Sequence, residues 1–127
     1  MSRNAVTSEN APKAVGPYSH AVWAGDLLFL SGQVPIDPAT SKLAGADIGA
    51  QTEQVFKNIE AVLKSAGLSF DDVVKTNVFL TSMKNFQAVN AIYQTKFTAP
   101  CPARSAVAVA ELPLGAKIEI EMIAKRP

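Results

Sequence analysis

The sequence predicts a single α+β domain over residues 1–127, with one mixed β-sheet and two helices packed on one of its faces. Three observations indicate this fold class. Apolar residues alternate with the period of a strand in some segments and recur with the period of a helix in two others. These segments follow one another in the order β-β-α-β-α-β-β, which is typical of helices interleaved with a sheet. A content of 48% hydrophobic and 18% charged residues suits one well-packed core.

The first two strands are predicted as a hairpin over Ser19–Gly32. Two apolar runs flank the pair Gly25 and Asp26, which is suited to a tight turn. The following segment, VPIDPATSKLAG, contains two prolines and several turn-forming residues. It therefore predicts a loop.

The first helix is predicted from about Gly49 to Ala66, and a strand follows it. The apolar residues of the helix share one stripe and comprise Val55, Ile59, Val62, Leu63 and Ala66. Gly67 comes next, at a place where helices commonly end in a left-handed residue. The segment DVVKTNVFLTS is rich in β-branched and aromatic residues and predicts a strand.

The last part of the chain predicts one more helix and two more strands. The segment NFQAVNAIYQTKF places its larger apolar side chains on one helical face, namely Phe86, Val89, Tyr93 and Phe97. The small apolar run Ser105–Ala110 is typical of a strand buried on both faces. GAKIEIEMIAK alternates cleanly, and ELPLGAK between the two runs predicts a hairpin connection.

This arrangement leaves one face of the sheet uncovered. Neither face of the run Ser105–Ala110 is polar, and two helices cannot cover both sides of a sheet. A second copy of the same chain is the simplest cover, so the sequence predicts a homo-oligomer.

Composition and targeting signals argue against several classes of partner. The net charge is +1 and the twelve Lys and Arg are scattered, so no nucleic-acid surface is expected. Cys101 is the only cysteine, which excludes an internal disulfide and favours a reducing compartment. No signal peptide or membrane-length apolar run is present, so a cytoplasmic protein without membrane partners is expected. His20 is the only histidine, and neither a histidine-rich metal site nor a Ser-His-Asp triad is predicted.

Arg104 and Glu119 are the first candidates for a functional site. The planar guanidinium of Arg104 stands among small residues and could present two parallel donors to a carboxylate. A structural ion pair or a surface position at a strand end is the alternative interpretation. Glu119 lies on the polar side of the last strand with Lys117 and Glu121, which could equally be a solvated face.

The expected hairpin fixes the relation between these two candidates. If its turn centres on Leu114 and Gly115, Glu119 lies opposite Ala110 and on the same face as Arg104. The separation along the strand is then about 20 Å. Either the two residues are unrelated, or a site forms where two subunits meet.

The Ser31–Gly32 pair is a weaker candidate. It ends the second predicted strand, and Gly32 permits a ligand to approach the backbone closely. Alternatively, the pair simply marks a turn.

Six segments of the chain together resemble the Rid proteins, the reactive intermediate deaminases also called YjgF-like. In chain order they are ENAPKAVGPYSHAV, LLFLSGQVPIDP, VVKTNVFL, VNAIY, PARSAVAVAELP and KIEIEMIA. The resemblance implies a chorismate-mutase-like α+β fold and a homotrimer with three sites at subunit interfaces. It also implies hydrolysis of 2-iminobutanoate and 2-iminopropanoate to 2-oxo acids and ammonia, without cofactor or metal. Such imines arise from pyridoxal-phosphate-dependent dehydratases.

The resemblance also assigns roles to individual residues. It implies that Arg104 binds the substrate carboxylate and that Glu119 positions or activates water. Tyr18, the Ser31–Gly32 pair and Asn90 fall on the remaining positions of the family's site. Ala106 stands where many relatives carry cysteine, so no thiol acts there. The alternatives are a 2-oxo-acid sensor without turnover, a ribonuclease or translation inhibitor, and a chaperone-like protein.

Overall fold

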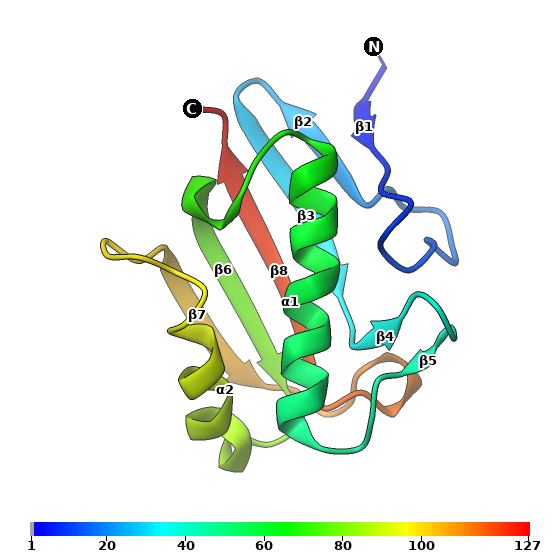
Figure 1. The fold of residues 1–127 in the computed structure, drawn as a ribbon, viewed down its shortest axis with the longest axis vertical. Helices are drawn as coiled ribbons and strands as arrows, with labels where there is room; N and C mark the ends of the chain where they lie inside the picture. The colour runs from blue at the N-terminus through cyan, green and yellow to red at the C-terminus, as the bar shows by residue number, and fades with distance from the viewer. Residues whose placement is uncertain (1) are drawn as a thin grey trace.

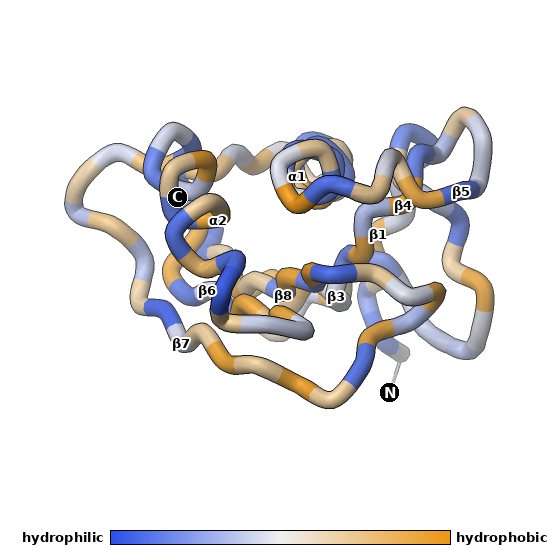
Figure 2. Tube along the Cα trace, turned by 90° about the horizontal axis from the view of Figure 1, so that it is seen from below, coloured by the Kyte–Doolittle hydropathy of each residue, from blue (hydrophilic) through white to orange (hydrophobic). Residues whose placement is uncertain are grey.

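The computed structural model describes residues 2–127 and confirms the α+β class, with two helices lying across one face of a mixed sheet (Figures 1 and 2). The six strands of the sheet lie in the order β1-β2-β3-β8-β6-β7. Their bounds are β1 Asn4–Val6, β2 Ala21–Ala24, β3 Leu27–Gln33, β6 Val73–Leu80, β7 Ala103–Ala108 and β8 Ile118–Lys125. The helices are α1, Ile48–Ser65, and α2, Phe86–Tyr93. No helix in the described range is long and apolar enough to cross a membrane.

The predicted β2–β3 hairpin is confirmed. Gly25 adopts the left-handed φ of 59° that the tight turn requires, and Ala24 pairs with Leu27 across it. The predicted loop after β3 contains a small hairpin of β4, Ile36–Asp37, and β5, Lys42–Leu43. Neither this hairpin nor the short strand β1 was expected, because each is too short to show a hydrophobic period.

Helix α1 begins one residue before its predicted start and ends close to its predicted end. Asp47 caps it by accepting hydrogen bonds from the amides of Gly49 and Ala50. After the helix, Gly67 takes a φ of 76° and donates to the carbonyl of Lys64. The predicted apolar stripe, apart from the partly buried Ala66, is fully buried against the sheet and forms the centre of the core.

Helix α2 is shorter than predicted and ends at Tyr93. Phe97 lies beyond the helix but still packs on its last residue, with a distance of 4.8 Å between the ring centroids of Tyr93 and Phe97. The spacing of the aromatic residues therefore correctly predicts that they pack together, but it predicts a helix that is too long.

The predicted pairing of the last two strands is wrong. β7 pairs only with β6, in parallel, while β8 lies between β3 and β6 and is antiparallel to both (Figure 1). β8 buries Ile118, Ile120 and Met122, so it takes a central place where both neighbours add to the core. β7 carries small side chains that bury little, and it takes the edge.

β7 is consequently exposed over most of its length in one chain, in contrast to the prediction that it is buried on both faces. The sheet face away from the helices also exposes large apolar side chains. Phe29 on β3 is 44% exposed, and Val107 on β7 is 47% exposed. The expected cover by a second copy stays a prediction.

Candidate functional site

The carboxylate of Glu119 lies directly against Gly32 on the open face of the sheet. Gly32 falls within an irregularity of the β3–β8 pairing, where the register shifts between Leu30 and Gln33. A Cβ atom placed on Gly32 would lie 2.9 Å from Cδ of Glu119 and closer still to Oε2. The carboxylate thus occupies the space that glycine leaves free.

The surroundings of Glu119 change its acidity. Burial raises the pKa of Glu119 above its ordinary value, and the negative charge of Glu121 raises it further. Glu121 is held in place on the same face, since Asn77 donates a 3.0 Å hydrogen bond to its Oε1. A carboxylate with a raised pKa is a stronger base near neutral pH.

Ser31 connects this carboxylate to the loop that carries Tyr18. Its hydroxyl donates to the carbonyl of Ser19 at 2.7 Å, and its amide donates to the carbonyl of His20 at 2.9 Å. Tyr18, one residue before Ser19, is 49% exposed. We call Ser31, Gly32 and Glu119, together with Tyr18 on the loop that Ser31 anchors, the carboxylate group of the site.

Arg104 belongs to a second assembly at the edge of the sheet, between β7 and α2. Its Nη1 donates a 2.7 Å hydrogen bond to Oδ1 of Asn90. Its guanidinium carbon lies 4.7 Å from the ring centroid of Tyr93 and 5.2 Å from that of Phe86. We call Arg104 with these three side chains the arginine group.

The guanidinium of Arg104 is held in position without being neutralised. No carboxylate within residues 2–127 lies close enough to form an ion pair with it. Arg104 is an exposed residue, and within residues 2–127 its one recorded side-chain hydrogen bond is the one to Asn90. Fixed, exposed guanidinium donors next to aromatic rings suit the binding of a carboxylate.

The carboxylate group and the arginine group lie on opposite faces of the sheet, which corrects the prediction that Arg104 and Glu119 share a face. Arg104 is in register with Thr76, whose hydroxyl contacts that of Tyr93 on the helix side at 2.8 Å. Glu119 is in register with Phe79, whose side chain points to the other face by strand alternation. The error follows from the wrong strand pairing. One chain does not bring the two groups together.

Two contacts of the site were not predicted from the sequence. They are the stacking of Arg104 on Phe86 and Tyr93, and the hydrogen bond that fixes Glu121. The period of α2 could have revealed the first, because Phe86, Asn90 and Tyr93 are spaced by four and three residues and share one helical face.

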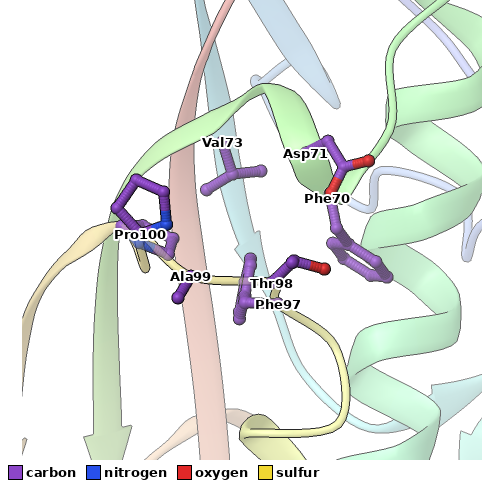
Figure 3. A pocket seen from close by; sticks show the side chains of 8 residues that line it. Phe70, Asp71, Val73, Phe97, Thr98, Ala99 and Pro100 are labelled. Carbon is purple, nitrogen blue, oxygen red and sulfur yellow. The ribbon is translucent and has the colours of Figure 1, made fainter.

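A surface cavity of about 380 Å³ adjoins the arginine group through Phe97, which packs on Tyr93, but no member of either group lines it (Figure 3). Phe70, Asp71 and Val73 line one side, and residues of the segment that leads into β7 line the other. None of the predicted site residues lines it. Within residues 2–127, no three His, Cys, Asp or Glu side chains lie together as a metal site would require.

A family model and several known proteins match nearly the whole length of this chain. A family model described as endoribonuclease L-PSP matches residues 8–126. Protein DfrA of Myxococcus xanthus is 49% identical over 98% of this chain and 96% of its own length. The 2-iminobutanoate/2-iminopropanoate deaminase of Salmonella typhimurium is 47% identical over 95% of this chain and 96% of its own length. The crystal structure of the YjgF gene product from E. coli superposes with a TM-score of 0.91 at 44% identity, covering 98% of this chain and 99% of that chain.

Proposed function

Because this chain belongs to the Rid family, whose model is described as endoribonuclease L-PSP, we propose that it is an imine deaminase. The proposed reaction is hydrolysis of 2-iminobutanoate and 2-iminopropanoate to the corresponding 2-oxo acids and ammonia. A relative with that name matches at 47% identity over 95% of this chain. The structural observation that carries the proposal is the guanidinium of Arg104, which Asn90 fixes and which no acid among residues 2–127 neutralises.

In this proposal Arg104 binds the carboxylate of the 2-imino acid. Its planar donors grip both carboxylate oxygens, which orients the adjacent C=N carbon for attack. Asn90 and the rings of Phe86 and Tyr93 restrict the guanidinium to one orientation. The binding therefore requires little ordering of the side chain.

Glu119 acts as the general base. It accepts a proton from water as the water oxygen bonds to the imine carbon, while the C=N π electrons move to the nitrogen, which takes up a proton from solvent; the product is a tetrahedral carbinolamine. The protonated Glu119 then returns its proton to the nitrogen. The C–N bond breaks with its electron pair leaving on ammonia, and the hydroxyl proton passes to solvent, which gives the 2-oxo acid. A raised pKa suits Glu119 to both transfers.

The active site is proposed to form between two copies of the chain in a homotrimer. One copy supplies the arginine group, and its neighbour supplies the carboxylate group with Tyr18, Ser31 and Gly32. Two observations support this arrangement. The two groups lie on opposite faces of one sheet, and the open face around Glu119 exposes Phe29 and Val107.

The test is a coupled assay in which a threonine dehydratase generates the imine and semicarbazide traps it. We expect the protein to reduce semicarbazone formation in proportion to its concentration and Arg104→Ala to abolish this effect. Arg126→Ala is the matched control, because Arg126 is also exposed and stacks on an aromatic ring, that of Trp23 at 3.9 Å. An Arg104→Ala variant as active as the wild type would overturn the proposal.

RNA cleavage is the second candidate, and the observation that favours it is the description of the family model. The same protein preparations, incubated with a labelled single-stranded RNA, decide between the two. Cleavage that survives in Arg104→Ala while imine hydrolysis is absent from the wild type would favour the ribonuclease.

A further inference from the structure

The loop formed by residues 13–19, between β1 and β2, is exposed along most of its length but anchored at both ends. Val15 is 88% exposed and Tyr18 is 49% exposed. On one side the half-buried Pro12 separates the loop from the buried Ala11, which is 3% exposed, and on the other the loop ends at the buried His20, which is 4% exposed. Holding the two ends of such a loop together restricts the conformations that it can adopt, in addition to the 2.9 Å bond from the amide of Tyr18 to the carbonyl of Gly16 within it.

The ring of His20 makes that connection. Its Nδ1 accepts a 3.0 Å hydrogen bond from the amide of Ser8, and its Nε2 lies 2.7 Å from the carbonyl oxygen of Pro12. A backbone amide can only donate and a carbonyl can only accept. Both partners together therefore fix the neutral ring with its proton on Nε2, and this ring closes the loop from Pro12 to His20.

We propose that His20 is a positioning residue, whose neutral ring clasps the loop 13–19 and so sets the place of Tyr18 in the active site. The inference rests on the proposed function, because it gives Tyr18 a part in the site. Because His20 is only 4% exposed, we assign it a role through the loop and not in direct contact with the substrate.

The connection from the clasp to the site runs through Ser31. The end of the loop is fixed to β3, because Ser31 donates hydrogen bonds to the carbonyls of Ser19 and His20. The residue after Ser31 is Gly32, which lies against Glu119. The start of the loop is tied to that end by the bond from His20 to Pro12. Without the bond between His20 and Pro12, Ser19 on one side of Tyr18 stays bonded to Ser31, but the start of the loop is no longer tied to its end. A displacement of about 1 Å at an active site can cost about a hundredfold in rate.

Two substitutions distinguish the loss of the hydrogen bonds of His20 from a change in the volume of its side chain. His20→Gln keeps one acceptor and one donor in an uncharged side chain, whereas His20→Leu fills similar space with neither. The first measurement is amide hydrogen exchange, which needs no substrate. We expect faster exchange in residues 8–19 of His20→Leu, unchanged exchange in β8, and wild-type exchange in His20→Gln. Unchanged exchange of residues 8–19 in His20→Leu would overturn the clasp.

The second measurement is a double-mutant cycle for imine hydrolysis. We expect Tyr18→Phe to cost about tenfold in kcat/KM in the wild type and in His20→Gln, but under about twofold in His20→Leu, since residues in one network are not additive. Equal losses in all backgrounds would show that His20 is merely structural and would overturn the inference. A wild type without imine hydrolysis would overturn the proposed function and the role of Tyr18, while the exchange measurement would still decide the clasp.

Discussion

Replacing Gly32 by alanine tests the placement of Glu119 with a single methyl group. The added Cβ would lie 2.9 Å from Cδ of Glu119 and closer to Oε2, so the carboxylate has to move away. The backbone of Gly32 does not adopt a left-handed φ, and alanine is therefore compatible with the local conformation.

The size of the effect follows from this geometry. Ordinary contact between a Cβ and a carboxylate begins at about 3.4 Å, so relief of the clash displaces the end of Glu119 by an ångström or more in the closest direction. Such a displacement of a general base costs about a hundredfold in kcat. The fold itself should change in stability by less than about 1 kcal/mol, because the clashing atoms end a flexible side chain.

The assay is imine hydrolysis measured beside urea unfolding of the same protein. Gly49→Ala is the matched control, because Gly49 also avoids a left-handed φ and its new Cβ would lie 3.4 Å from Oδ1 of Asp47, an ordinary contact. We expect full activity in this control. A folded Gly32→Ala protein that loses less than about threefold in kcat would refute the assignment of Glu119 as general base.

Four further predictions follow, three from the two groups and one from the open face of the sheet. Arg104→Lys keeps the charge but loses the planar donors, so kcat/KM should fall about a hundredfold, mainly through KM, in steady-state kinetics. Since Glu119 must be ionised to accept a proton, kcat/KM should fall as the pH drops through its raised pKa, and Glu121→Gln should shift this limb of the pH profile to lower pH. The raised pKa of Glu119 also affects stability, because ionising its carboxyl group above that pKa opposes folding. Glu119→Gln should therefore have a higher free energy of unfolding than the wild type at neutral pH, as measured by unfolding in urea. If the proposed homotrimer forms through the open face, Phe29→Lys or Val107→Lys should dissociate it in sedimentation experiments, whereas the control Lys125→Arg, which leaves the net charge unchanged, should not.

The sequence contains enough information for the elements of the fold but not for all of their neighbours. Alternation along Ile118–Lys125 and the stripe of Ile48–Ser65 correctly predict which side chains face the core. Alternation cannot say which strand lies beside which. A short glycine-containing connection favoured a hairpin between β7 and β8, yet β6, α2 and β7 form a strand-helix-strand unit that favours parallel pairing. The second signal was present in the sequence and prevails in the structure.

The same limit applies to the candidate site. Arg104 and Glu119 were identified by residue type and by resemblance, but their faces depended on the strand pairing and were predicted incorrectly. The helical period of Phe86, Asn90 and Tyr93 carried a signal for the contacts of Arg104. The contacts around Glu119 could not be predicted from the sequence. They join residues far apart in sequence, as Asn77 and Glu121 do, or depend on a missing side chain, as at Gly32.

Covering the apolar open face in the proposed assembly would change the pKa of Glu119 in two ways. A second copy that covers Phe29 and Val107 removes water from around Glu119 and further raises its pKa, which strengthens it as a base. The arginine group of that copy brings a positive charge to the same site, which limits the rise and keeps the carboxylate ionised when the substrate is bound. The surface that would hold the subunits together therefore also sets the basicity of Glu119, and a monomer would lack both the substrate anchor and the strong base.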